Sequence, residues 1–428
     1  MSYLKEKKVA QAMMNDFGLR SGLAPRVIRH FQGCLEKELE SDSITSIFFN
    51  DWKESFRSLH GKISQEEGKI KVKELSNAEF KVDKLLFVLY TYYILVIEIF
   101  STFVFSRNPR EQVLNECFGD TVKTRAHLDA LKNGLYFKRT CNIENYYPQE
   151  CFFWYTSCWR GETGIIIKRL AENIHDCFEK IDFSSFNRPD EGFLDNFYQT
   201  LIPRSIRHDL GEFYTPSWLA ELILDEAGYG GSITRSILDP SCGSGVFLME
   251  CIKKTIEFGK DKSKISLVQA ITSNIMGFDI NPIAVFTAKT NYLRSLFMLL
   301  KESKFKTKIS IPVIRFDSIL DDESEIDIKS TQFDFLVGNP PWVKWDFLSR
   351  EYKEKIKQNL QEYSLFSHKG MAAGLGYSHD DISVVFTYLV MDRFLKQGGI
   401  LGFILKQTLY KGMTGKDFRN FCIKKDGA

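Results

Sequence analysis

Four short apolar segments in the second half of this chain each end in an acidic or amide side chain. They span residues 236–238, 275–278, 311–316 and 333–338, and the residues that follow them are Asp239, Asp279, Asp317 and Asn339. Short apolar runs that alternate with helical patterns are typical of a parallel sheet with crossover helices. The sequence therefore predicts a Rossmann-like, doubly wound α/β sheet. A fifth strand is expected at residues 400–405, after a helix over 383–390 and a turn at Gly398 and Gly399.

The first of these strands leads into a glycine-containing loop. It reads Asp239-Pro240-Ser241-Cys242-Gly243-Ser244-Gly245, and a helix is expected from Val246 onward. Glycines permit unusual backbone angles and let a ligand approach the main chain closely. No Lys-Ser/Thr pair follows the glycines, which excludes a Walker phosphate loop, and Leu248 stands where the dinucleotide-binding fingerprint needs a third small residue. Cys242 is expected to be required for its small size rather than as a reactive thiol.

The fourth strand is followed by Asn339-Pro340-Pro341-Trp342. The exocyclic amino group of a nucleobase is a poor nucleophile, because its lone pair is delocalised into the ring. The Asn339 side-chain oxygen and the Pro340 carbonyl, held by a rigid Pro-Pro turn, can accept both amino protons and draw the nitrogen toward sp3 geometry. The Trp342 ring offers a face for an extruded base, a contact worth about 1–3 kcal/mol. The alternative is an ordinary strand-to-turn stop.

On these two motifs the chain resembles the gamma-type N6-adenine DNA methyltransferases. Its tetrapeptide is similar to their (N/D/S)PP(Y/F/W) motif, and its 239–245 loop is similar to their loop for S-adenosylmethionine. The resemblance implies that Asp279 accepts hydrogen bonds from the ribose hydroxyls of the cofactor and that Ile280 packs against its adenine. It also implies that Asp317 accepts from the adenine amino group. Taken alone, either aspartate would more often be a helix N-cap or a solvated turn residue.

The segment Tyr214-Thr215-Pro216 precedes both motifs. In the family that the chain resembles, such a segment closes over the methionine end of the cofactor. This implies that the Thr215 hydroxyl and nearby backbone amides bind the methionine carboxylate. Alternatively, Thr215 caps a helix over 217–223 that Pro216 opens, and both roles can hold together because a helix start favours an anion.

The resemblance covers about residues 191–428 and implies transfer of a methyl group from S-adenosylmethionine to adenine N6 in double-stranded DNA, within a restriction-modification or phage-defence system. Asn at position 339 favours adenine over cytosine N4. The family's last two strands and its target recognition domain are expected to be missing. Either the chain is a fragment, or those parts come from another polypeptide, such as a specificity or C-terminal recognition subunit. Two alternatives remain open. One is methylation of a protein glutamine or of RNA, and the other is a cofactor-binding subunit that is inactive without a partner.

Composition adds few constraints. The formal net charge is +2, which neither supports nor excludes a local basic cleft for DNA. Nine cysteines are scattered without a CxxC pair or a His/Cys cluster, so no metal site or disulfide framework is expected and a cytoplasmic location fits best. Residues 85–105 are apolar enough to need a membrane check, but Glu98 within them indicates a buried core helix, so no membrane partner is expected.

The first half, residues 1–190, is expected to form a mostly helical domain, with helical spacing at 27–39 and 165–178 and a linker at 187–192. Ile47-Phe48-Phe49 and Trp52 with Phe56 are expected to pack on one helix face. Trp154 and Trp159 are interpreted mainly as core, with binding of a partner or DNA as the alternative. The charged stretch around Glu67-Gly68-Lys69 and Glu74 lacks the pattern of a PD-(D/E)xK nuclease and is expected to be a solvated loop.

Within the catalytic domain, residues 191–428, an insertion over 346–380 follows Trp342. It opens with a charged helix at 350–361 and ends in a glycine-bearing stretch that is expected to act as a lid or to touch DNA. Its lysines are expected either to contact phosphates or to form a solvated helix face; they are Lys344, Lys353, Lys355, Lys357 and Lys369.

Overall fold

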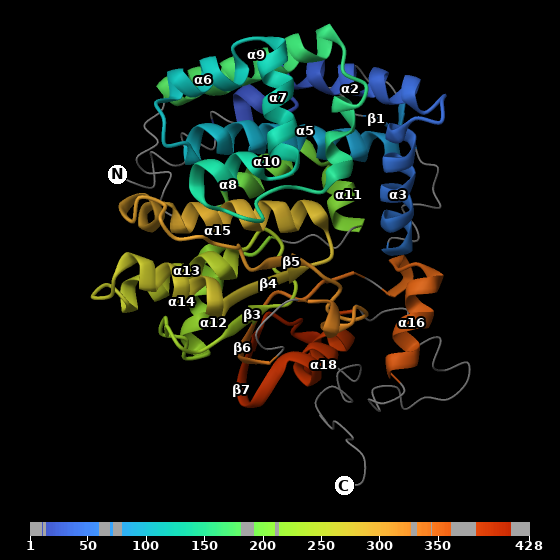
Figure 1. Ribbon diagram of the computed structural model, residues 1–428. Coiled ribbons are helices and arrows are strands. Elements are labelled where there is room, and N and C mark those ends of the chain that lie inside the picture. The colour runs from blue at the N-terminus through green and yellow to red at the C-terminus, as the bar shows by residue number, and fades with distance from the viewer. Residues whose placement is uncertain are drawn as a thin grey trace.

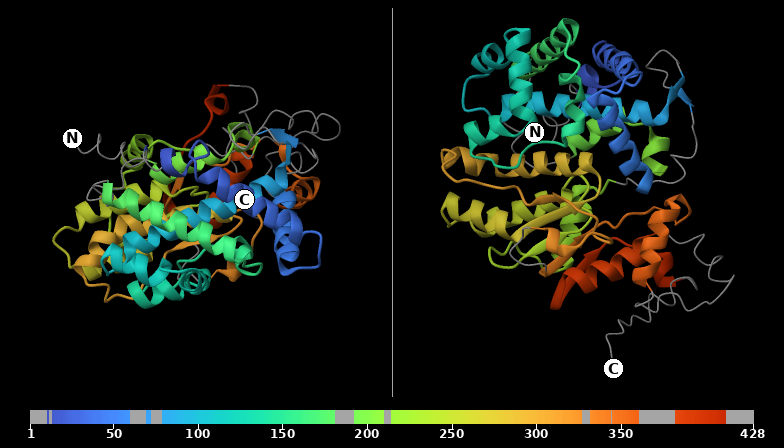
Figure 2. Two further views of the ribbon diagram at one scale, coloured as in Figure 1. Left: turned by 90° about the horizontal axis from the view of Figure 1, so that it is seen from above. Right: turned by 45° about the vertical axis from the view of Figure 1, so that its right-hand side comes forward.

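The computed structural model describes residues 11, 14–59, 69–71, 79–180, 192–209, 214–326, 332–343, 345–360 and 382–411. A group of helices from the first half of the chain lies above a five-stranded sheet, and the long helix α15 (Pro282–Glu302) runs between them (Figure 1). The right-hand view of Figure 2 shows the same stacking from another side. The predicted fold class, a doubly wound α/β sheet preceded by a mostly helical region, is confirmed.

The sheet has the strand order β5-β4-β3-β6-β7, and all neighbouring strands are parallel. Its strands are β3 (Ile237–Asp239), β4 (Ile275–Asp279), β5 (Val313–Arg315), β6 (Phe333–Gly338) and β7 (Leu395–Phe403). The order runs outward in one direction from β3 to β5 and in the other from β6 to β7. The reversal point therefore lies between β3 and β6, and ligands of open α/β sheets bind beside the carboxyl ends of the strands at such a point.

β5 and β7 differ most from their predicted extents. β5 is shorter than residues 311–316, and β7 begins at Leu395 rather than after the Gly398-Gly399 turn. The two glycines lie inside β7, where the register with β6 jumps: Phe333 pairs with Leu395, whereas Phe335 pairs with Ile400. The extra residues of β7 form a bulge. The glycines therefore mark an irregularity within the strand and not its start.

The two faces of the sheet are covered by different helices. On one face lie α12 (Ser217–Glu226), α13 (Val246–Phe258), α14 (Lys264–Asn274) and α15, and on the other lie α16 (Arg350–Leu360) and α18 (Ser383–Phe394). Neighbouring side chains of a strand face different cores: in β3, Ile237 belongs to the first, whereas Leu238 belongs to the second. A sheet covered on both faces accounts for the nearly continuous apolar runs in the sequence.

The first half of the chain forms a bundle of helices around α5 (Val82–Phe105). The other elements are α2 (Ala24–Glu38), α3 (Ile44–Leu59), the short antiparallel pair β1 (Lys69–Lys71) and β2 (Glu79–Lys81), α6 (Arg110–Phe118), α7 (Thr121–Lys132), α8 (Leu135–Cys141), the 3-10 helix η2 (Glu150–Thr156), α9 (Gly161–Lys180), α10 (Phe193–Leu201) and α11 (Arg204–Asp209). The most apolar window of α5 is entirely buried inside the protein, which confirms its interpretation as a core helix.

Most of the aromatic residues in this half pack as predicted. Trp154 is buried, and the rings of Trp52 and Phe56 stack with their centroids 5.2 Å apart. Ile47 is an exception, because it points to solvent and is 57% exposed. The solvated loop expected near Lys69 is also wrong in part, since Lys69 begins β1. The linker expected at 187–192 lies almost wholly outside the described residues.

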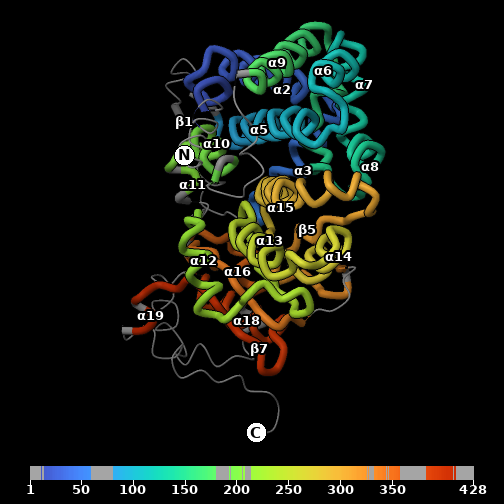
Figure 3. The backbone as a smooth tube through the Cα atoms, turned by 90° about the vertical axis from the view of Figure 1, so that its left-hand side faces the viewer, coloured from blue at the N-terminus to red at the C-terminus, as the bar shows by residue number. Residues whose placement is uncertain are grey.

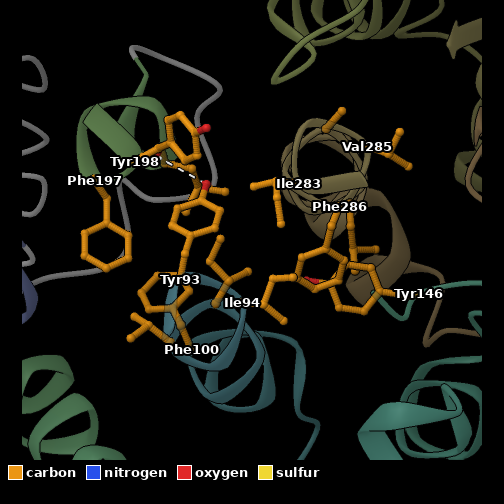
Figure 4. Close-up of a cluster of buried hydrophobic side chains, with 14 of the residues drawn as sticks. Tyr93, Ile94, Phe100, Tyr146, Phe197, Tyr198, Ile283, Val285 and Phe286 are labelled. Atoms are coloured by element: carbon orange, nitrogen blue, oxygen red, sulfur yellow. Dashed lines mark hydrogen bonds between the residues drawn. The ribbon is translucent and has the colours of Figure 1, made fainter. Parts of the chain in front are cut away.

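The helical bundle and the sheet share one continuous core. Tyr93 and Ile94 of α5 point toward Ile283 and Phe286 of α15, and Tyr198 of α10 approaches the same cluster (Figure 4). In Figure 3, α15 lies between α5 and α13. It therefore packs against the helical bundle on one side and against the helices of the sheet layer on the other. The boundary at residue 190 stays a prediction, although α10, which follows it, packs on α5.

Candidate active site

A cavity of about 230 Å³ opens at the carboxyl ends of β3, β4, β5 and β6. It lies at the reversal point of the strand order, where a ligand is expected. Most of the residues predicted from the two motifs line it: Tyr214, Thr215, Asp239, Pro240, Cys242, Gly243, Asp279, Ile280, Asp317, Asn339, Pro340 and Pro341. Pro216, Gly245 and Trp342 are not among its lining residues. The structure therefore brings together segments that are more than 120 positions apart in the sequence.

The loop after β3 folds tightly because its glycines adopt positive φ angles, 53° at Gly243 and 88° at Gly245. The Cys242 backbone N–H donates to the Phe278 carbonyl at 2.8 Å, which fixes the loop to β4. The Cys242 side chain is buried, and burial raises the pKa of its thiol well above the ordinary value. The thiol thus stays protonated at neutral pH, in keeping with the prediction that its small size matters.

Asp279, at the end of β4, is held by backbone donors from two loops. The Gly243 N–H donates to its Oδ2 at 2.9 Å, and the Asn281 N–H donates to its Oδ1 at 2.8 Å. Burial raises the pKa of Asp279 to about 6, against the opposing effect of these hydrogen bonds. Each oxygen keeps a further lone pair that can accept from a ligand. The side chain therefore combines a fixed position with a charge state that changes just below neutral pH.

Asp317, after β5, is surrounded by three donors. Its Oδ1 accepts from the backbone N–H groups of Ile319 and Leu320 at 2.9 and 3.2 Å, and its Oδ2 accepts from the Tyr352 hydroxyl at 2.9 Å. Burial raises the pKa of this carboxyl. Sequence reasoning missed Tyr352. The sequence did contain a signal for it: Tyr352 and Ile356 are four residues apart in an otherwise charged helix. This spacing places both side chains on the same face of the helix.

Asn339 follows β6 and is oriented by the Tyr-Thr-Pro segment. Its Nδ2 donates to the Thr215 hydroxyl oxygen at 3.3 Å, while the Ser241 hydroxyl donates to its backbone carbonyl at 3.3 Å. Its Oδ1 is buried and has no hydrogen-bond partner among the described residues. Since Nδ2 is engaged with Thr215, Oδ1 is the acceptor that remains for a ligand.

The alternative interpretation of Thr215 as a helix cap is wrong. The N-cap of α12 is Pro216, and no side chain makes a capping hydrogen bond there. With Pro216 in the cap position, Thr215 lies one residue too early to reach the first free N–H groups of the helix. Its hydroxyl contacts Asn339 instead. Tyr214 lines the cavity beside Tyr198 of α10, with the ring centroids 6.1 Å apart.

Trp342 lies beside the cavity and has a cation over its ring. The Lys406 ammonium, just beyond β7, is 5.4 Å from the ring centroid. Among the lysines of the insertion, Lys355 pairs with Glu351 at 2.9 Å across one turn of α16, as expected for a solvated helix face. Lys344 and Lys369, together with the glycine-bearing stretch, lie outside the described residues.

The glycine loop and the Asn-Pro-Pro turn line a cavity at the reversal point of a Rossmann-like, doubly wound sheet. Residues 273–427 match the model of the Eco57I restriction-modification methylase family.

Curated relatives are similar to part of the chain at moderate identity. The type II methyltransferase M.BstVI of Geobacillus stearothermophilus is 26% identical over 218 residues, which cover 49% of this chain and 36% of that protein. The adenine-specific methyltransferase PglX of Streptomyces coelicolor is 28% identical over 132 residues, or 28% of this chain and 11% of that protein. The chain therefore spans about a third or less of the length of these relatives.

Among solved structures, a DrdV–DNA complex determined by cryo-electron microscopy has a TM-score of 0.55 to this chain. Its sequence identity is 16%, and the match covers 98% of this chain and 37% of that one. At this identity the likeness shows the fold. It extends over the helical bundle as well as the sheet, so the bundle and sheet recur together in that protein.

Proposed function

We propose that this chain transfers the methyl group of S-adenosylmethionine to the N6 amino group of adenine in double-stranded DNA. The observation that carries the proposal is the Asn339 Oδ1 atom, which is buried without a hydrogen-bond partner among the described residues and belongs to a side chain in the cavity wall. Leaving such an acceptor unpaired costs about 1–3 kcal/mol. The amino hydrogen of a base inserted into the cavity would satisfy it.

The other cavity residues fit S-adenosylmethionine. Asp279 and Asp317 provide fixed carboxylate acceptors for ribose hydroxyls and for an adenine amino group, and Ile280 and Phe316 provide apolar walls. When bound, this cofactor supplies an electrophilic methyl group on a sulfonium. The glycine loop at 239–245 and the Tyr214-Thr215 segment enclose the remaining side of the cavity, where the methionine part is proposed to lie.

The protein's part in the reaction is to orient and polarise the amino group. Asn339 Oδ1 and the Pro340 carbonyl accept hydrogen bonds from its two N–H groups, which turns the nitrogen lone pair out of conjugation with the ring. These two oxygens would keep their hydrogen bonds to the amino group while its nitrogen is methylated by the cofactor. One of the two protons is then released to solvent. Fixed acceptors of this kind act without reorganising during the reaction.

Trp342 is proposed to stack on the extruded base. The Lys406 ammonium lies over its ring, so a base that stacks on this face must displace that ammonium. Base stacking on an aromatic ring is worth about 1–3 kcal/mol, which exceeds the contribution of about 0.5–1 kcal/mol from an exposed cation–π contact. The exchange is therefore favourable, and the displaced ammonium becomes available to a neighbouring phosphate.

DNA and adenine are proposed as substrate because of the family and the relatives. The matched family is one of restriction-modification methylases, and PglX is named as adenine-specific. Asn in the first position of the tetrapeptide agrees with adenine. The names of these relatives give no support to protein glutamine or RNA as the substrate. A role in restriction-modification, with a specificity or recognition subunit as partner, belongs to the same proposal.

The decisive experiment is methyl transfer from labelled S-adenosylmethionine to unmethylated genomic DNA, followed by digestion to nucleosides. We expect N6-methyladenine from the wild-type chain and none from Asn339→Ala, with cofactor affinity by calorimetry unchanged within about twofold. Asn274→Ala is the matched control, because the Asn274 amide bonds the Ile233 carbonyl away from the cavity.

Label found in N4-methylcytosine would overturn the choice of base, and label found only in protein or RNA would overturn the choice of DNA. Intact cofactor binding without any transfer would mean that another polypeptide segment or subunit must supply DNA recognition.

A further inference from the structure

The helix α16, which follows the catalytic tetrapeptide, packs an apolar face against the cofactor side of the cavity. Tyr352 and Ile356, four residues apart, are buried in the same core as Phe316 and Ile319. The opposite face of α16 carries the exposed ion pairs Arg350–Glu354 and Lys355–Glu351. Such division of a helix into an apolar and a charged face fixes its rotation. Tyr352 is thereby directed into the cavity wall.

The Tyr352 hydroxyl donates to Asp317 Oδ2 at 2.9 Å. The two backbone donors on the other oxygen, from Ile319 and Leu320, leave Oδ2 with Tyr352 as its described donor and with one lone pair to spare. A carboxylate held by three donors cannot rotate about its χ2 bond without breaking at least one of them. The direction in which the spare lone pair points is thus set by α16.

We propose that Tyr352 is a positioning residue for the cofactor: its hydroxyl holds the Asp317 carboxylate so that Oδ2 accepts a hydrogen bond from the 6-amino group of the cofactor's adenine. The inference rests on the proposed function, because it takes the cavity to be the site of S-adenosylmethionine. It assigns to α16, an element close in sequence to the target-base motif, a role at the opposite, adenine end of the cofactor.

A second contact fixes α16 from outside. The Ser349 hydroxyl, immediately before the helix, donates to the Ser58 carbonyl near the end of α3, and α16 lies below α3 in Figure 1. The helical bundle therefore supports the helix that carries Tyr352. The bundle contacts the start of α16, and Tyr352 of α16 contacts Asp317. Through these two contacts the first half of the chain would contribute to the proposed cofactor site.

The test compares two ligands that differ only in the 6-amino group: S-adenosylhomocysteine and its analogue with hydrogen in place of that amino group. Calorimetry on the full chain measures both affinities in the wild type and in Tyr352→Phe. We expect Tyr352→Phe to weaken S-adenosylhomocysteine about tenfold, the size of one hydrogen bond to a charged group, and to change the affinity for the analogue less than twofold.

Two further variants keep the result interpretable. Tyr229→Phe removes another buried hydroxyl, which bonds Thr255 3.0 Å away outside the cavity, and should alter neither affinity. In the background of Asp317→Asn, Tyr352→Phe should cause less than a twofold further loss, since the two residues act through one contact.

Equal losses for both ligands in Tyr352→Phe would overturn the proposal and leave Tyr352 a packing residue. Unchanged affinity for S-adenosylhomocysteine would overturn it as well. Failure of the wild-type chain to bind either ligand would overturn the cofactor assignment itself, and with it both proposals. Wild-type binding without the selective loss would leave the proposed function intact while removing only the role of Tyr352.

Discussion

The side-chain nitrogen of Asn339 lies 3.3 Å from the hydroxyl oxygen of Thr215, a residue 124 positions earlier in the chain. This hydrogen bond joins the segment before the cofactor loop to the tetrapeptide at the end of β6. It decides which end of the Asn339 amide faces a ligand, because an amide with its nitrogen engaged presents its oxygen. Thr215 therefore orients the Asn339 amide.

Replacing Thr215 by valine tests this role. Valine has nearly the same shape but cannot accept the hydrogen bond, so the amide of Asn339 is free to rotate. We expect kcat to fall about tenfold, the effect of one lost hydrogen bond, with the affinity for S-adenosylhomocysteine kept within twofold. Thr215→Ser, which keeps the hydroxyl, should retain most of the rate. If affinity falls and kcat does not, Thr215 binds the methionine carboxylate instead.

We expect the affinity for the proposed cofactor to depend on pH through the ionisation of Asp279. Its pKa is about 6, raised by burial, and only the ionised form offers both oxygens to ribose hydroxyls. The affinity for S-adenosylhomocysteine should fall as pH is lowered, to about one tenth at pH 5 of its value at pH 7. Calorimetry across this range measures it. Asp279→Asn should bind more weakly and show a flat profile; a profile as steep as that of the wild type would assign the titration to another group.

The same pKa has the opposite effect on folding. Because the folded value lies above the unfolded value of 3.8, the native state holds the proton more tightly, and Asp279 makes the protein less stable as pH rises from about 4 to about 6. Bound cofactor reverses that trend in the same window, since it favours the ionised carboxylate. Thermal melts with and without ligand should therefore diverge as pH increases.

We expect that position 338 cannot take a side chain without disturbing its neighbours. A Cβ atom at this position would lie 2.6 Å from Asp239 Oδ1, inside the central pair of strands. Gly338→Ala must shift β6 or the buried carboxylate, and we expect the free energy of unfolding to fall by about 1–3 kcal/mol. Because Asn339 is the next residue, transfer should fall more than tenfold.

Gly33→Ala is the matched control for this substitution. A Cβ at Gly33, within α2, meets nothing within 4 Å, so this variant should be as stable as the wild type or up to about 1 kcal/mol more stable. Urea unfolding of both variants measures the difference. If the free energy of unfolding of Gly338→Ala equals that of the wild type, the strands accommodate the extra methyl group.

The sheet and most of the cavity were predictable because their signals are local. Each apolar run and the polar residue after it lie within about ten positions, and parallel strands bring their ends together without further information. Contacts between distant segments were not predictable in this way. The bond from Tyr352 to Asp317 depends on how α16 packs, and the bond from Asn339 to Thr215 depends on Pro216 taking the N-cap position. The β7 bulge likewise follows from pairing with β6, which the Gly-Gly pair alone does not specify.

Glu98 predicts an effect on stability far from the active site. Its carboxyl lies fully buried within α5, and neither oxygen has a hydrogen-bond partner among the described residues. Burial raises its pKa well above the ordinary value of 4.5, so the native state holds the proton that the unfolded chain releases. The free energy of unfolding should therefore decrease as pH rises above about 4.5, by up to about 1.4 kcal/mol per pH unit from this group.

Glu98→Leu removes both the proton and the unpaired oxygens. We expect this variant to be more stable than the wild type by about 1–3 kcal/mol at pH 7, with a gain that shrinks toward pH 5. Glu98→Gln is the control: it removes the titration but keeps a buried polar group, so it should flatten the pH dependence while remaining less stable than Glu98→Leu. Urea unfolding at pH 5, 6 and 7 measures all three proteins. A Glu98→Leu protein that loses stability at every pH would mean that the carboxyl contributes to the packing of the bundle.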